Sequence, residues 1–291
     1  MNSCCVSEVR RCRPLLGTFV EVCAWMPASS CNRTEMLNRA VANAFASMER
    51  IESLMSVHDP ASELSLVNRQ AAERPVRVSA ETFEVLRRGL DLARESSGAF
   101  DFTVAPLLAL WGLLPSMLKR RCPGNWQAVR VLRGQRIQFD RPLALDLGGI
   151  AKGYAVDRAV EALQAAGVSS GWVNAGGDLR AFGDRPLDVG IRHPRTGQHL
   201  PSSLRIENEA LATSSPTFSL KRWKGAMVSH LVNPRLGCAM ASPIAVTVRA
   251  AECWIADALT KAVINSMNVS NASQLERMLD RHQATAQVFS A

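Results

Sequence analysis

The sequence predicts a fold in which helices and strands are mixed within one unit, and three observations support this expectation. Apolar residues recur at intervals of three and four from Leu37 to Met55, which is the spacing of a helix buried on one face. Short apolar runs at 129–132 and 137–139, with Gly134 between them, are typical of a two-stranded hairpin. No internal repeat, low-complexity tract or linker divides the 291 residues, so we expect no independent domains.

The N-terminal part is predicted to hold a short extension, residues 1–13, followed by a first strand over residues 14–25. The extension contains arginines but no apolar segment before Pro14, so it lacks the pattern of a signal peptide. The pair Cys4-Cys5 also lacks the preceding apolar segment of a lipoprotein signal. We therefore expect residues 14–291 to form one cytoplasmic domain, with an exported or membrane-associated protein as the alternative.

Composition excludes several classes of protein. Hydrophobic residues make up 47% of the chain, enough for a sizeable core, and no apolar run is long enough to cross a membrane. The net charge is +8, but the basic residues are scattered and aromatic residues are only 5%, so we expect no nucleic-acid partner. The eight cysteines include no C-x-x-C pair and no zinc-binding spacing, which favours free thiols.

Two further helices are predicted beside the one that ends near Met55. One starts at Ser79 and stops at Gly98, and another starts near Tyr154 and stops at Gly167. The glycine at each C-terminal end can take the left-handed conformation that commonly terminates a helix.

The stretch from Leu143 to Leu179 carries the most chemistry. The apolar run 143–145 is long enough to finish a strand, and Asp146, Gly148-Gly149 and Lys152 follow it. Glycines let backbone N–H groups approach a ligand, and a helix N-terminus favours negative charge, so this arrangement suits a phosphate. The alternative is a tight strand-to-helix turn whose glycines serve only packing. The Rossmann and P-loop fingerprints are both absent.

The segment D-L-G-G-I-A-K-G-Y-A-V-D, residues 146–157, and V-N-A-G-G-D, residues 173–178, resemble the signature of the ApbE family, the FAD:protein FMN transferases. Other segments resemble the family's motifs in the same order, namely 16–18, 62–68, 98–112, 229–237 and 253–263. The resemblance implies an α+β fold of the ApbE type, similar to the T-fold, with mixed sheets, packed helices and a flavin cleft between two lobes.

The resemblance also implies a set of residues that bind FAD, the substrate. These are Leu16, His58, Ala99, Phe100, Asp101, Asp146, Lys152 and Leu231. Read without the resemblance, a carboxylate among apolar neighbours such as Asp101 needs a partner, which could be a backbone cap as well as a ligand.

The implied metal is Mg²⁺, held by the carbonyl of Gly149 and the side chains of Asp257 and Thr260. Asp257 and a hydroxyl one turn later present two oxygens on one helix face, and Mg²⁺ prefers oxygen ligands. His230 is the implied general base, although a lone histidine is more often structural. His230 and Asp257 are therefore the predicted catalytic residues.

Several residues depart from the family's pattern. His58 stands where an aromatic residue is common, Phe102 replaces proline, and Asn233 replaces aspartate. The family commonly has threonine four residues after the metal-binding aspartate, whereas this chain has Thr260 at three and Lys261 at four. The implied function is attachment of FMN through a phosphoester to a Thr or Ser of an acceptor flavoprotein of electron transport, with release of AMP. An FAD pyrophosphatase and a non-catalytic flavin-binding protein are the alternatives.

Overall fold

A β-hairpin opens the described chain where one strand was predicted. The computed structural model describes residues 6–27, 33–120, 124–267 and 272–290. Strand β1 (Val6–Leu15) pairs with β2 (Thr18–Pro27) along its whole length. Leu16 and Gly17 form the two-residue turn with φ of 56° and 70°, and positive φ at both positions is typical of a tight hairpin turn.

The prediction of one strand over residues 14–25 is therefore wrong. Leucine rarely adopts a positive φ, so the sequence carried only half of the usual signal for this turn. Most of the predicted extension, residues 6–13, instead forms β1 at the edge of the main sheet.

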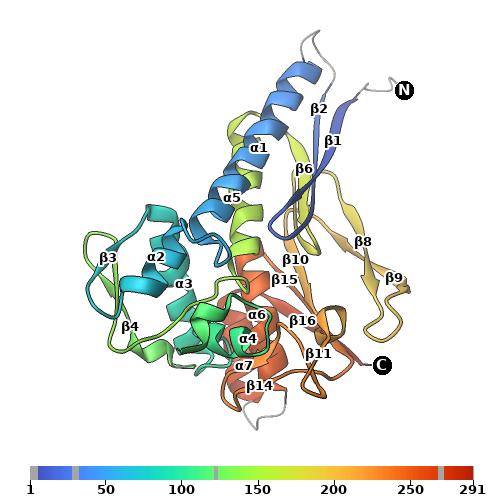
Figure 1. Cartoon of the computed structure of the whole chain (residues 1–291). Coiled ribbons are helices and arrows are strands. Elements are labelled where there is room, and N and C mark those ends of the chain that lie inside the picture. Colours follow the sequence, from blue (N-terminus) through green and yellow to red (C-terminus); the bar gives the residue numbers. More distant parts are fainter. Residues whose placement is uncertain (1–5, 28–32, 121–123, 268–271, 291) are drawn as a thin grey trace.

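The main sheet has seven antiparallel strands among the described residues (Figure 1). Its order is β1, β2, β6 (Ser170–Ala175), β7 (Asp178–Phe182), β10 (Ala210–Ser214), β15 (Ile244–Ala250) and β16 (Thr285–Ser290). Neighbouring strands alternate in direction throughout, so the sheet is built from hairpins and longer antiparallel connections.

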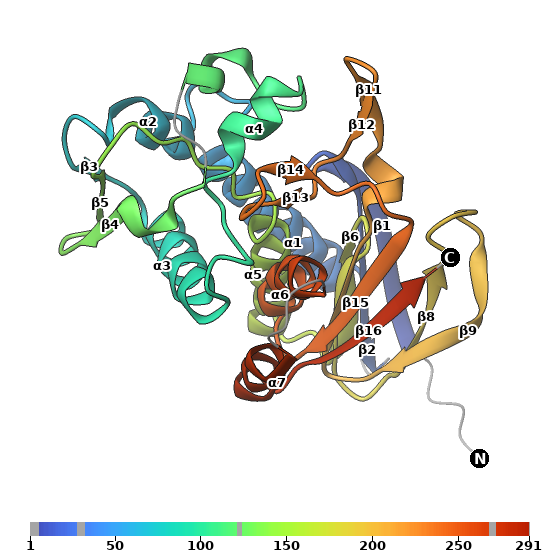
Figure 2. The ribbon, with the colours of Figure 1, turned by 90° about the horizontal axis from the view of Figure 1, so that it is seen from below.

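Three helices cover one face of this sheet: α1 (Arg33–Met55), α5 (Ala151–Ala165) and α6 (Cys253–Ser266) (Figure 2). The predicted apolar stripe of α1 is its buried face, which confirms that helix. A hairpin of β8 (Leu187–Arg192) and β9 (His199–Ile206) packs its apolar residues on the other face. The central strands of the sheet are therefore buried on both sides.

A smaller lobe lies beside the helices (Figures 1 and 2). It contains α2 (Glu63–Gln70), α3 (Ala80–Glu95), α4 (Ala105–Leu110) and a sheet of β3 (Val76–Arg77), β5 (Arg136–Phe139) and β4 (Val129–Leu132). Ser79 caps α3 by accepting a hydrogen bond from the backbone N–H of Thr82, and the predicted helix there is confirmed. The hairpin around Gly134 is confirmed as well.

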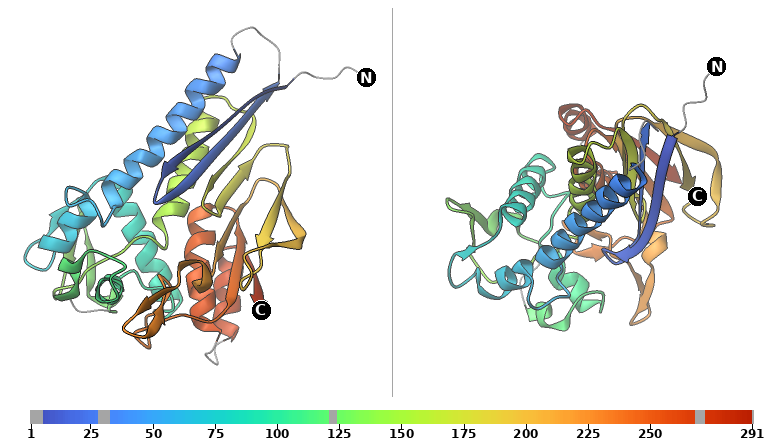
Figure 3. Two further views of the ribbon diagram at one scale, coloured as in Figure 1. Left: turned by 45° about the vertical axis from the view of Figure 1, so that its right-hand side comes forward. Right: turned by 90° about the horizontal axis from the view of Figure 1, so that it is seen from above.

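The remaining elements are short. They are the 3₁₀ turns η1 (Ser116–Arg120), η2 (Trp126–Ala128) and η3 (Pro216–Ser219), the hairpins β11 (Lys221–Trp223) with β12 (Ala226–Val228) and β13 (Val232–Asn233) with β14 (Cys238–Ala239), and helix α7 (Ala272–Arg281). Figure 3 shows the β11–β12 hairpin projecting from the end of the sheet opposite the β1–β2 edge. No helix in the described part of the chain is both long and apolar enough to span a membrane.

Residues 143–145 do not form the predicted strand. Leu145 instead donates its N–H to Asn68 Oδ1 at 2.7 Å, while Asn68 Nδ2 donates to the Leu145 carbonyl at 3.0 Å. This buried side chain satisfies the backbone of an extended segment without a neighbouring strand. Asn68 thereby connects α2 to the segment that leads into α5.

Candidate functional site

Asp146 lies at the turn that leads into α5. Its backbone N–H donates to the Phe102 carbonyl at 2.8 Å, and its Oδ1 accepts from the N–H of Gly148 at 3.1 Å. Burial raises the pKa of this carboxyl, while the Gly148 hydrogen bond and the charges of His230 and His58 act in the opposite direction. Asp146 and His58, two residues predicted to bind FAD, therefore lie within electrostatic range of His230, the predicted base.

His230 lies in the loop after β12 and is exposed to solvent on one side. Neighbouring protein atoms nevertheless cover part of the ring, and this partial burial lowers the pKa of His230. Asp146 opposes that shift, while the positive charges of His58 and Lys221 add to it. A histidine with a lowered pKa is neutral near pH 7 and can accept a proton.

A group of four charged side chains lies between α5, β7 and α6. Lys152 forms an ion pair with Asp178, and Lys261 forms an ion pair with Asp257. The two carboxylates are almost fully buried, with Asp257 at 0% and Asp178 at 3% exposure. The N–H of Gly153 also donates to Asp257 Oδ2 at 3.1 Å. Each buried charge therefore has an opposite charge beside it, as its burial requires.

The pKa directions in this group follow from burial and pairing. Burial alone would raise the pKa of Asp257, but Lys261 and Lys152 lower it below its ordinary value. Burial and the nearby charge of Asp257 raise the pKa of Asp178. Burial would lower the pKa of Lys152, but the two carboxylates raise it well above its ordinary value. Lys152 therefore keeps its positive charge.

The position of α6 against α5 depends on Gly153 and Asp157. A Cβ at Gly153 would lie 2.4 Å from the Cys253 carbonyl oxygen, so only glycine permits this close approach. Asp157 accepts hydrogen bonds from the N–H groups of Cys253 and Trp254, each at 2.9 Å, and so caps α6 from a neighbouring helix. Arg180 pairs with the same carboxylate at 2.7 Å.

The predicted Mg²⁺ donors are already bonded to protein groups. Lys261 Nζ donates to both the carboxylate and the carbonyl of Asp257. Thr260 Oγ1 donates to the Asp257 carbonyl at 2.6 Å and lies 2.7 Å from Ser214 Oγ. The Lys261 stem lies against Gly149, with Cε 3.6 Å from where a Cβ on that glycine would be. Within the described ranges, no three His, Cys, Asp or Glu side chains gather as metal ligands. As arranged, these residues do not fit Mg²⁺.

Two hydrogen bonds from Asn265 position other segments that contain predicted FAD contacts. Asn265 Nδ2 donates to the carbonyls of Ala99 and Val232, both at 2.9 Å, and so holds segment 99–101 beside the Leu231 segment. Phe100 is buried, and its ring lies 3.7 Å from a Cβ position on Gly149. Asn265 therefore connects these contacts to α6, the helix that carries Asp257.

The carboxylate of Asp101 is bonded to neighbouring protein groups. The sequence left this open as the alternative to a ligand. Its Oδ1 accepts from the backbone N–H and the hydroxyl of Thr103 at 2.7 and 2.6 Å. Burial raises the pKa of this carboxyl, and the hydrogen bonds from Thr103 oppose the shift. Leu16 lies in the β1–β2 turn, where its N–H donates to Glu52 Oε1 at 2.8 Å.

Asp178 and Lys261 belong to the charged group but were not predicted as site residues. Lys261 had a visible signal, because Asp and Lys four residues apart on a helix face each other. Asp178 had a weaker signal, because its pairing with Lys152 depends on how β6 and β7 fold against α5.

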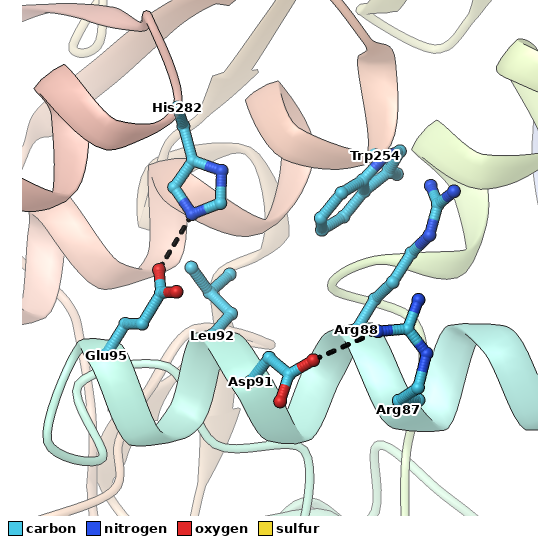
Figure 4. A pocket seen from close by; sticks show the side chains of 7 residues that line it. All are labelled: Arg87, Arg88, Asp91, Leu92, Glu95, Trp254 and His282. Carbon is cyan, nitrogen blue, oxygen red and sulfur yellow. Dashed lines mark hydrogen bonds and ion pairs between the residues drawn. The ribbon is translucent and has the colours of Figure 1, made fainter.

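A cavity of about 300 Å³ lies elsewhere, between α3, α6 and α7 (Figure 4). Its lining residues are Arg87, Arg88, Asp91, Leu92, Glu95, Trp254 and His282. Glu95 lies 2.8 Å from His282, and Arg88 stacks 4.6 Å from the centre of the Trp254 ring. None of the predicted FAD contacts is among its lining residues. The cavity is therefore separate from the candidate site.

An antiparallel sheet covered by three helices, with a charged group where two of them meet, defines this chain as an α+β protein with a site at a helix junction. The model of the ApbE family matches residues 16–288, and the chain belongs to the ApbE family. The predicted fold type is thereby confirmed, while the flavin cleft remains a prediction.

Several relatives and solved structures agree with this assignment. The chain is 29% identical over 250 residues to an FAD:protein FMN transferase of Vibrio cholerae, covering 78% of this chain and 75% of that protein. It is 27% identical over 291 residues to one of Treponema pallidum, covering 88% and 78%.

The crystal structure of the ApbE protein of Thermotoga maritima matches with a TM-score of 0.83 and 25% identity, over 97% of this chain and 94% of that one. The flavin transferase ApbE of Vibrio cholerae has a similar fold, with a TM-score of 0.80 and 24% identity over 97% and 93%.

Proposed function

We propose that this protein is an FAD:protein FMN transferase. Two neighbouring pairs near the start of α5 carry the proposal. Asp146 lies within electrostatic range of His230, and Lys152 lies within electrostatic range of Asp257. Relatives that share most of the chain carry this activity in their names. The acceptor would be the hydroxyl of a Thr or Ser on a flavoprotein of electron transport.

The reaction requires that the protein position the two substrates and supply positive charge. It needs no covalent intermediate with the protein. The acceptor oxygen attacks the phosphorus of the FMN half of FAD, the bond to the bridging oxygen breaks, and AMP leaves. FMN then stays on the acceptor through a phosphoester. Negative charge on the pyrophosphate is the main barrier, so cationic side chains at the site stabilise the transition state. Lys152 remains charged beside Asp178 and is a cationic group for this role.

His230 is the proposed base for the acceptor hydroxyl. Its lowered pKa keeps the ring neutral near pH 7, and its exposure lets an acceptor side chain reach it. Asp146 lies close enough to influence the charge of the ring. The negative charge of Asp146 opposes the lowering of the His230 pKa without reversing it, and Asp146 is the residue proposed to orient FAD.

The expected Mg²⁺ ion enters no step of this mechanism. Resemblance to the family suggests Gly149, Asp257 and Thr260 as its ligands. Asp257 is occupied by Lys261, and the Thr260 hydroxyl is directed to a carbonyl and to Ser214.

One observation favours a second function. Because His230 is exposed to solvent, a water molecule could take the place of the acceptor hydroxyl. The protein would then be an FAD pyrophosphatase that releases free FMN and AMP. The two reactions share the site and differ only in the nucleophile.

The test measures AMP release from FAD by the full chain, with and without a candidate acceptor domain, together with the mass of that domain. We expect AMP release and an FMN-sized mass gain on the acceptor. His230→Ala should reduce transfer by about 100-fold or more, the size of losing a general base. His199→Ala, at an exposed histidine of β9, should leave transfer unchanged.

Other outcomes separate the alternatives. AMP with free FMN and no modified acceptor would favour the pyrophosphatase. FAD that stays bound without AMP release would favour the non-catalytic flavin-binding protein. Full transfer by His230→Ala at saturating FAD would remove His230 as the base.

A further inference from the structure

Lys261 occupies the place where the family resemblance leads us to expect a metal ion. It follows Asp257 by one helical turn, at a position where the family commonly has threonine. Its side chain extends along α6 toward the turn before α5, and its Cδ and Cε atoms lie against Gly149. The side chain is 17% exposed, so it is mostly buried but still reached by solvent.

The ammonium group contacts Asp257 Oδ1, which is one of the oxygens that a metal at this site would use. Nζ forms an ion pair with Asp257 Oδ1 and donates to the Asp257 carbonyl at 3.0 Å. A lysine ammonium has three donors, so one remains for a ligand. Its charge also lowers the pKa of Asp146 and of Asp178, which places it within electrostatic range of both carboxylates.

We propose that the Lys261 ammonium replaces the divalent cation at this site and stabilises the negative charge of the FAD pyrophosphate during transfer. The proposal rests on the function proposed above. A divalent cation would have to displace the ammonium from Asp257 and would be repelled by it. A tethered ammonium supplies one positive charge in a fixed place and needs no metal from solution.

The transfer step balances without a further reactant. The acceptor oxygen forms a bond to the FMN phosphorus, and the bond from that phosphorus to the bridging oxygen breaks. The electron pair of that bond leaves with AMP, and the hydroxyl proton passes to His230. Lys261 takes no part in the proton transfer and acts only through its charge and its third N–H.

The alternative is a purely structural role, in which Lys261 only stabilises α6 through its ion pair with Asp257. In that case its removal would lower the thermal stability of the protein but would leave the rate of transfer without metal unchanged. Transfer in excess chelator therefore separates the two explanations, and metal binding tests whether Lys261 excludes the ion.

The first test measures binding of Mn²⁺, as a paramagnetic substitute for Mg²⁺, by electron paramagnetic resonance. It uses the full chain after dialysis against chelator. We expect Lys261→Thr to bind Mn²⁺ tighter than wild type by roughly tenfold or more, because a like charge is removed beside Asp257. Lys224→Thr removes an equal charge from an exposed turn and should bind Mn²⁺ as wild type does. Equal Mn²⁺ binding by wild type and Lys261→Thr would overturn the proposal.

The second test compares transfer in excess chelator with transfer in added Mg²⁺. Wild type should transfer FMN at the same rate in both. Lys261→Met keeps the length of the side chain and loses its charge, so in chelator its rate should fall on the order of 100-fold. A wild-type enzyme that stops in chelator and recovers with Mg²⁺ would overturn the proposal.

The two tests distinguish a failure of the proposed function from a failure of the proposal for Lys261. If no variant transfers FMN under any condition, the proposed function fails, whereas Mn²⁺ binding still tests whether Lys261 excludes the metal. Thermal melting of each variant confirms that it is folded before either test is interpreted.

Discussion

The charges of Asp146 and His58 influence the pKa of His230, and this sets the pH range in which His230 can act as a base. Burial lowers the pKa of His230, Asp146 raises it, and His58 lowers it further. The free enzyme should therefore lose kcat/KM only as pH falls below the ordinary histidine value of about 6.5, because protonated His230 cannot accept a proton.

Two variants should move this acidic limb of kcat/KM in opposite directions. His58→Asn removes a positive charge near His230, so the limb should move to higher pH. Asp146→Asn removes a negative charge, so it should move to lower pH. Each shift should be of the order of half a pH unit or more. The measurement is a pH profile of kcat/KM for AMP release, and a limb that stays in place in both variants would contradict His230 as the titrating group.

At the same scale, the sequence indicated candidate site residues but not the partners that surround them. His230, Lys152 and Asp257 were recognisable from the motifs around them, and the structure places Lys152 and Asp257 in one charged group. The direction of the Thr260 hydroxyl was not predictable, because it depends on Ser214, a residue 46 positions away on β10. Such contacts are fixed by tertiary packing and leave no local pattern.

The contact between α5 and α6 is the element-scale feature that holds the charged group together, and Gly153 permits it. Gly153→Ala would place a Cβ 2.4 Å from a backbone oxygen of α6, which cannot rotate away. The helices would have to separate, which would weaken the Gly153 hydrogen bond to Asp257. We expect the free energy of unfolding to fall by about 3 kcal/mol, at the upper end for overpacking.

Urea unfolding of Gly153→Ala, followed by circular dichroism, measures this loss. Gln164→Ala, at an exposed position of the same helix, is the matched control and should change stability by less than about 0.5 kcal/mol. A Gly153→Ala protein as stable as the control would mean that α5 and α6 can move apart at little cost.

Helices with a clear local sequence signal were predictable. A turn or segment that depends on one unusual residue or one distant side chain was not. The stripe of α1 and the cap of α3 are local signals, and both helices formed as expected. The β1–β2 turn depends on a leucine with positive φ, and residues 143–145 depend on a side chain from α2. In both places a specific interaction overrode the apolar pattern.

At the scale of the whole molecule, the two lobes share one apolar core. One continuous cluster contains Leu86 on α3 and Ile137 on β5 in the smaller lobe, Val173 and Val248 on the main sheet, and Leu259 on α6. An apolar core that runs through both lobes resists separate unfolding, because opening either lobe exposes the surface of the other. We therefore expect the described residues to behave as one domain that includes β1, which begins before the predicted boundary at residue 14.

The last prediction is therefore a single cooperative transition. In urea, tryptophan fluorescence and far-ultraviolet circular dichroism should give the same midpoint and the same slope. FAD at about 100 times its Kd should shift both probes together, corresponding to roughly 2.7 kcal/mol, because it binds only the folded state. If one probe changed at lower urea, or FAD shifted only one of them, the lobes would unfold independently. The charged group at the start of α5 would then lie between two separately stable units, whereas a common midpoint would mean that binding at this group stabilises the entire chain.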